Sequence, residues 1–146
     1  MIRFDNVGKR YANGGDALAD LSFEIGAGEM VFVTGHSGAG KSTLIKLLAL
    51  IERPTRGQIA IDGEPLANTR GARIAAYRQR LGLVFQDYRL LEDRSVAANV
   101  ALPLQIAGCD DTELQKRVRA ALDLVGLGGR ERVRPSPSDP SVIGPN

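Results

Sequence analysis

The sequence contains almost no cysteine, and this scarcity limits its chemistry. Cys109 is the only cysteine among 146 residues. One thiol excludes a disulfide within the chain, which fits a protein of the reducing cytosol. Cys109 belongs to no recognisable motif, so we expect it to have no chemical role.

Long apolar runs and strong charge are also lacking. No run approaches the roughly 18 apolar residues that are needed to span a bilayer, and the first residues show no signal-peptide pattern. The net charge of +2 is too small to indicate nucleic-acid binding. Apolar residues make up 43% and charged residues 25% of the chain, a composition that predicts one ordinary globular domain with one core.

Glycine, by contrast, is concentrated where a phosphate-binding loop needs it. Residues 35–42 match the pattern Gly-x-x-x-x-Gly-Lys-[Ser/Thr]. Three glycines in this loop let the backbone adopt positive φ and approach a ligand closely, so that successive N–H groups form a nest for phosphate oxygens. Lys41 supplies a positive charge for the β- and γ-phosphates, and the Ser42 hydroxyl can bind Mg²⁺.

The segments on either side of this loop support that interpretation. Residues 30–34 form a short apolar, β-prone run, which predicts a buried parallel strand. After the loop, apolar residues at helical spacing predict a helix that reaches Ile51 and is closed by Pro54, with its positive dipole end at the loop. The only histidine, His36, lies within the loop, and we expect it to face solvent. The alternative is a glycine-rich turn with a coincidental lysine.

Strand-like segments surround this unit. Residues 2–7 and 17–25 predict two antiparallel strands added to an α/β core. Residues 58–61 predict another strand, and Asp62-Gly63 predicts a hairpin turn. Asp62 ends an apolar strand and could be taken for a Mg²⁺ ligand, but the glycine after it favours the turn.

A positively charged segment and a second apolar run follow. The region from Arg70 to Arg80 predicts an exposed helix face; the alternative is a contact surface for acidic lipid head groups or a partner. Residues 81–85 predict a strand, and Gln86 comes directly after it. A polar amide just past the carboxyl end of a strand lies where α/β sheets bind ligands.

Two helices and a tail complete the chain. Residues 95–106 predict a helix bent at Pro103. Thr112 to Gln115 match a capping box at the start of a second helix, for which Gly126 suits the C′ position. Residues 128–146 hold four of the seven prolines and show no apolar periodicity, so we expect an irregular or disordered tail.

Taken in order, these motifs resemble an ABC-type ATPase domain over residues 1–127. Tyr11 resembles the aromatic residue that stacks on adenine, residues 35–43 resemble the Walker A loop, and Gln86 resembles the Q-loop glutamine. The resemblance implies an α/β fold, namely a P-loop NTPase core of the ABC type with an N-terminal antiparallel β-layer, a partial helical subdomain and an incomplete C-terminal part. Within the family, the similarity is to the branch that acts in cell division.

The resemblance also implies cofactors and residue roles. ATP and Mg²⁺ are the expected cofactors. Gln86 is the candidate catalytic residue because the family glutamine touches Mg²⁺ and the attacking water, and Ser42 is the second candidate metal ligand. The residues expected to bind the nucleotide are Tyr11, Gly35, His36, Ser37, Gly38, Ala39, Gly40, Lys41, Ser42 and Thr43.

The expected partner is an integral membrane subunit, with a homodimer as in the intact family and no nucleic acid. We expect a cytoplasmic protein, peripheral on the cytoplasmic face of the inner membrane, whose contact with the membrane runs only through the partner.

The chain departs from the family pattern at Gly128. The Leu-Ser-Gly-Gly-Gln signature, the Walker B strand ending in Asp-Glu and the switch histidine do not occur in the 146 residues. This predicts a truncation or a shifted reading frame, and a core with exposed apolar faces and unpaired edges. Without the acid that activates water, we expect nucleotide binding with negligible turnover.

Several functions therefore stay open. The chain is predicted to be the ATP-binding subunit of a cell-division ABC complex, itself deficient in hydrolysis. One alternative is the nucleotide-binding subunit of a related lipoprotein or amino-acid transporter, and another is a non-hydrolysing module that binds nucleotide or a partner. A small P-loop kinase is disfavoured by the antiparallel strands before the loop.

Overall fold

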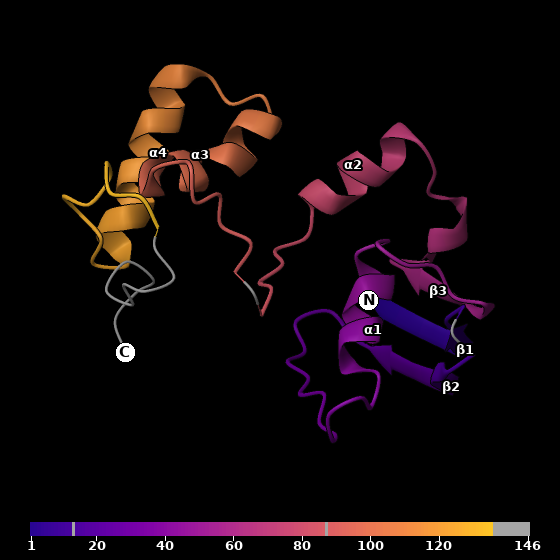
Figure 1. The fold of residues 1–146 in the computed structure, drawn as a ribbon. Coiled ribbons are helices and arrows are strands. Elements are labelled where there is room, and N and C mark those ends of the chain that lie inside the picture. Colours follow the sequence, from indigo (N-terminus) through magenta and orange to yellow (C-terminus); the bar gives the residue numbers. More distant parts are fainter. Residues whose placement is uncertain (13, 87, 136–146) are drawn as a thin grey trace. The chain divides into compact units, whose positions relative to one another are not determined.

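The computed structural model describes residues 1–12, 14–86 and 88–135. The chain divides into two units, Met1–Leu81 and Gly82–Asn146. The positions of these units relative to one another are not determined, so each is described by itself (Figure 1). Most of the expected tail, from residue 136 onward, lies outside the described residues.

The first unit is built on an antiparallel sheet. Its strands are β1 (Ile2–Arg10), β2 (Asp16–Ile25), β3 (Arg56–Ile61) and β4 (Glu64–Pro65), in the order β2-β1-β3-β4. The two predicted N-terminal strands are confirmed, and they pair with Ile2 opposite Ile25 and Phe4 opposite Phe23. The rings of Phe4 and Phe23 stack with their centroids 4.5 Å apart.

The hairpin between β3 and β4 confirms the turn predicted at Asp62-Gly63. Both residues have positive φ, 51° and 82°, as a two-residue type I′ turn requires. The Asp62 carboxylate accepts a hydrogen bond from the amino group of Met1 at 2.7 Å and another from Arg80 at 3.4 Å. These bonds lower the pKa of Asp62, and they bind the carboxylate to its own unit.

One face of the sheet carries the helix α1 (Lys41–Leu48), as Figure 1 shows. Its apolar residues share a core with the inner side chains of β1 and β3. The buried members of this core are Phe4, Val7, Leu44, Leu47, Leu50, Ile59 and Leu66. Packing of the apolar side of α1 against the sheet stabilises the unit by about 25 cal/mol per Å² of apolar surface removed from water. The helix direction that buries this side is therefore favoured.

The end of α1 is held by α2 (Ala72–Gln79), which follows the short 3₁₀ helix η1 (Leu66–Asn68). The Tyr77 hydroxyl donates to the Leu48 carbonyl at 2.5 Å, and the Arg78 guanidinium donates to the carbonyls of Ala49 and Leu50, both at 2.9 Å. Leu50 has a φ of 53° and lies in the left-handed region. The helix therefore ends at Leu48, earlier than the sequence predicted. Burial raises the pKa of Tyr77.

The exposed helix face predicted between Arg70 and Arg80 is confirmed, since α2 has no buried residue. Not all of its positive charge is directed to solvent, because Arg78 satisfies carbonyl groups at the end of α1.

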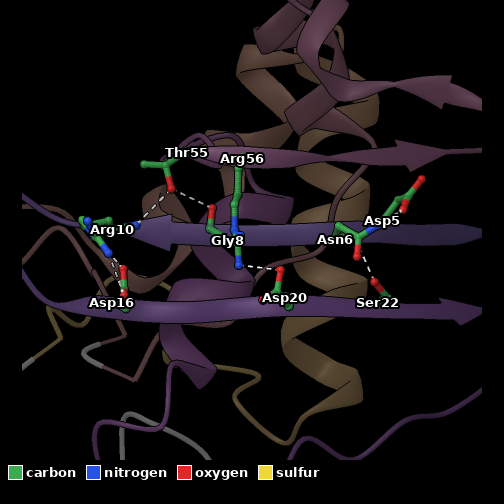
Figure 2. A network of polar contacts seen from close by, with 9 residues as sticks. All are labelled: Asp5, Asn6, Gly8, Arg10, Asp16, Asp20, Ser22, Thr55 and Arg56. Atoms are coloured by element: carbon green, nitrogen blue, oxygen red, sulfur yellow. Dashed lines mark hydrogen bonds and ion pairs between the residues drawn. The ribbon is translucent and has the colours of Figure 1, made fainter.

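A polar network runs over the strands of the sheet (Figure 2). The Arg56 side chain crosses β1 and pairs with Asp20 on β2. It crosses at Gly8, where a Cβ atom would lie 2.7 Å from the Arg56 Nε. Farther along, the Arg10 guanidinium donates to both carboxylate oxygens of Asp16, at 2.7 and 2.9 Å. This hydrogen-bonded pair lowers the pKa of Asp16 and raises that of Arg10.

Two predicted strands are wrong. Residues 30–34 and 81–85 have no strand structure, and most of their apolar side chains are exposed, with Phe32 at 82% and Val84 at 92%. A parallel strand forms only when neighbouring strands supply its hydrogen bonds. The sheet in the described part of the chain is antiparallel and uses other segments. The expected exposed apolar faces are thus present in these two segments.

The second unit is a pair of helices, α3 (Val96–Ile106) and α4 (Asp111–Leu124), with Pro103 inside α3. They pack through a core of Val96, Ala101, Leu114, Val118 and Leu122, with Cys109 against it. Residues near the start of α3 also bond to the segment after α4, since the N–H of Val96 donates to the carbonyl of Val133 at 2.7 Å. Among the described residues, no helix is long and apolar enough to span a membrane.

The caps of α4 confirm one prediction and correct another. The N-cap is Asp110, whose carboxylate accepts from the N–H groups of Thr112 and Glu113 at 3.0 and 3.1 Å. The capping box predicted at Thr112 is therefore wrong, because Asp110, two residues earlier, is a stronger N-cap residue than threonine. Gly126 has a φ of 72° and occupies the predicted C′ position after Val125.

Candidate functional site

The glycine-rich loop of residues 35–40 leads directly into α1. Gly35, Gly38 and Gly40 all have positive φ, 148°, 82° and 86° respectively, as the sequence predicts for this loop. Gly40 is the N-cap of α1 and lies in the left-handed region. A glycine N-cap offers no side-chain acceptor to the amides of the first helical turn. These amides are the groups that bind anions at helix N-termini.

Lys41, the first residue of α1, bends back over this loop. Its ammonium group donates to the carbonyl of Gly35 at 2.6 Å and to that of His36 at 2.8 Å. The positive charge is therefore held beside the loop backbone and not extended into solvent. His36 is exposed, as predicted, and its Nδ1 lies 2.7 Å from the Ser37 carbonyl oxygen.

Gly40 has a structural role that the sequence did not reveal. A Cβ atom on Gly40 would lie 2.4 Å from the carbonyl oxygen of Ala17 and 2.7 Å from the Leu18 Cδ2. A Cβ on Gly38 would meet nothing within 4 Å. At position 38 only the positive φ favours glycine, whereas Gly40 also lets the start of β2 lie against the N-terminus of α1.

Tyr11 lies beside the first turn of the same helix. Its hydroxyl oxygen is 3.3 Å from the Thr43 Oγ1, and the ammonium group of Lys9 is 5.0 Å from the centroid of its ring. Thr43 is buried, but Ser42 is exposed. The structure therefore gathers Tyr11, Lys41, Ser42 and Thr43 around the beginning of α1.

The exposed Ser42 hydroxyl fits a Mg²⁺ ion that keeps its own waters and is bridged to phosphate oxygens. In residues 1–12, 14–86 and 88–135 there is no cluster of three or more acidic, histidine or cysteine side chains for a metal. Ser42 therefore stays the candidate metal ligand of the first unit that the sequence predicts.

Gln86 belongs to the second unit and is exposed in a turn. Its position relative to Ser42 is not determined, because the two units are not placed relative to one another. The next residue, Asp87, lies outside the described residues.

Sequence reasoning missed a partly buried ion pair, in which Lys9 lies beside the Tyr11 ring. The ammonium of Lys9 donates to the Glu52 carboxylate at 2.6 Å and to the Arg53 carbonyl at 3.0 Å. The one available signal was the spacing of Lys9 and Tyr11, two residues apart in an extended segment and so on one side of it. Glu52 is too distant in the sequence for any local pattern to reveal the pairing.

Comparison with known proteins gives consistent matches. Residues 18–141 match the family described as ABC transporter. The chain is 49% identical over 127 residues to the cell division ATP-binding protein FtsE of Escherichia coli K12, covering 87% of this chain and 57% of that protein. It is 44% identical over 139 residues to the methionine import ATP-binding protein MetN of Geobacillus kaustophilus, covering 93% and 41%.

Solved structures agree with this result. An ATP-binding cassette, solved as a dimer in a post-hydrolysis state bound to ADP and Pi, has a TM-score of 0.83 and 29% identity, covering 92% of this chain and 62% of that one. The structure of cbiO1 from Clostridium perfringens, part of the ABC transporter complex cbiONQ, has a TM-score of 0.76 and 28% identity, covering 92% of this chain and 53% of that one. The predicted α/β fold class is confirmed. The chain spans little more than half the length of the FtsE proteins it matches.

Proposed function

Since the chain belongs to the ABC transporter family of ATP-binding proteins, we propose that the loop of residues 35–43 binds the triphosphate of Mg·ATP. The observation that carries this proposal is the geometry at the start of α1. Positive φ at three glycines, a glycine N-cap and a lysine folded over the loop are the features that a phosphate cradle needs.

Each proposed site residue has its own task. Lys41 moves its ammonium from the loop carbonyls to the β- and γ-phosphates, a charge-assisted contact. Ser42 holds the Mg²⁺ ion by its hydroxyl, and Mg²⁺ supplies neutralisation of the phosphate charge when bound. Tyr11 stacks on the adenine, and Gln86 is the proposed catalytic residue and the second candidate Mg²⁺ ligand.

Substitution of Lys41 tests the site. Lys41→Ala removes the only side-chain cation proposed for the phosphates, and hydrogen bonds to charged groups contribute roughly 1.5–3 kcal/mol each, so Mg·ATP binding should fall below detection by calorimetry. The matched control is Lys46→Ala, which removes the same charge from the last turn of the same helix and should leave the affinity unchanged. Equal affinity of Lys41→Ala and the parent chain would reject the site.

We further propose that this chain binds ATP without turning it over. The sequence of 146 residues contains no Leu-Ser-Gly-Gly-Gln signature and no Asp-Glu pair, and loss of a general base costs roughly 10²–10⁴-fold in rate. Purified chain with Mg·ATP should release no phosphate above background. Steady release that Lys41→Ala abolishes would contradict this proposal.

For the biological role, we propose an FtsE-like subunit that acts with an FtsX-like membrane protein in cell division, as a homodimer on the cytoplasmic face of the inner membrane. The 49% identity to FtsE supports it. The similarity to MetN supports a second candidate, a subunit of an amino-acid transporter. Co-expression with an FtsX-like subunit and with a methionine-transporter membrane subunit separates the two, since only the true partner should co-purify with the chain. A module that binds nucleotide but neither subunit is the third candidate.

A further inference from the structure

Lys9 places a positive charge in a buried position, which is rare in proteins. The residue is only 9% exposed, and a buried ammonium is tolerated only when it is paired. Glu52 provides the pairing carboxylate at 2.6 Å, and the Arg53 carbonyl accepts a second hydrogen bond at 3.0 Å. Both partners follow α1 in the chain, so they fix the ammonium beneath the end of β1.

The same ammonium covers one face of the Tyr11 ring. Its distance of 5.0 Å from the ring centroid is within the range of about 6 Å in which a cation is attracted to an aromatic face. The Tyr11 hydroxyl is held separately, 3.3 Å from Thr43 in the first turn of α1. The ring is therefore fixed at its edge and on one face, while the residue as a whole is only half-buried.

We propose that Lys9 is a positioning residue, which holds the Tyr11 ring in place so that the opposite face of the ring receives the base of the bound nucleoside triphosphate. The inference rests on the proposed function of the loop. A planar base can stack only on the face that Lys9 leaves open, and a ring ordered before binding loses less conformational freedom when the base arrives. Lys9 thus contributes to binding of the base but not of the phosphates.

Two ligands separate these contributions in calorimetric titrations of the whole chain: Mg·ATP and Mg·tripolyphosphate, which has the phosphates without the base. Lys9→Met should weaken ATP binding about tenfold, which is about 1.4 kcal/mol, and leave tripolyphosphate affinity unchanged. Lys9→Arg, which keeps a cation over the ring, should restore most of the ATP affinity. In a Tyr11→Ala background, Lys9→Met should have no further effect.

The controls keep the test decisive. Lys9→Met leaves the Glu52 carboxylate unpaired, so Lys9→Met/Glu52→Gln is measured beside it and should give the same loss for ATP alone. Equal weakening of both ligands, no change for either, or a further loss in the Tyr11→Ala background would overturn the inference. If the parent chain binds neither ligand, the proposed function itself is refuted, whereas equal parent affinity for both ligands refutes only the role of Lys9 and Tyr11.

Discussion

Gly40 provides the sharpest test of how the loop and the sheet depend on each other. Gly40→Ala forces an L-residue into φ 86°, which costs roughly 1–2 kcal/mol. The new Cβ would also lie 2.4 Å from the Ala17 carbonyl oxygen, and overpacking of this kind costs roughly 1–3 kcal/mol more. The free energy of unfolding should therefore fall by roughly 2–5 kcal/mol, a large part of the roughly 5–15 kcal/mol of a typical domain.

The matched control is Gly38→Ala, in the same loop. Gly38 has nearly the same φ, 82°, but a Cβ there meets nothing within 4 Å. Only the backbone term should remain, about 1–2 kcal/mol. Urea unfolding followed by circular dichroism measures both variants. If Gly40→Ala is no more destabilising than Gly38→Ala, the close approach of β2 to the helix N-terminus is not what requires glycine at position 40.

Two further predictions concern the surface. The pKa of Asp16 is lowered by its hydrogen bonds with Arg10, so the contribution of Asp16 to stability is present above the unfolded-state pKa and is lost as pH falls through the lower folded-state pKa. The variant Asp16→Asn should therefore weaken the dependence of the free energy of unfolding on pH in the acid range. An unchanged pH dependence would contradict the pairing. Phe32→Ser replaces a side chain that is 82% exposed, so it should change the free energy of unfolding by no more than about 0.5 kcal/mol. The same variant should reduce self-association measured by light scattering. A loss of several kcal/mol in the free energy of unfolding would mean that residues 30–34 are buried.

Local sequence signals predicted the elements whose cause is local. The alternation of residues 2–7 and 17–25 and the Asp62-Gly63 turn describe strands and a hairpin that pair with their own neighbours in the sheet. The glycine pattern of residues 35–40 likewise predicted the positive φ angles, because each angle is a property of one residue. The tasks assigned to the site residues and the boundary at residue 127 stay predictions.

The failures share a different physical origin. Residues 30–34 and 81–85 have strand-like composition, but a strand exists only where another strand accepts its hydrogen bonds, and composition does not reveal this partner. The Lys9–Glu52 pair, too, joins residues that are remote in the chain, so its burial follows from how α1 packs on the sheet. The N-cap of α4 shows the same limit on a smaller scale, since Asp110 and Thr112 are two capping candidates only two residues apart and the better acceptor, Asp110, is the cap.

The contact between Arg78 and the carbonyls of Ala49 and Leu50, which directly follow α1, gives this helix an electrostatic asymmetry. The guanidinium acts as a built-in counterion for the negative end of the helix. An eight-residue helix is about 12 Å long, which exceeds the Debye length of about 8 Å at physiological salt. The Arg78 guanidinium therefore neutralises the C-terminal end of the helix. It leaves the attraction of an anion to the N-terminal end unchanged.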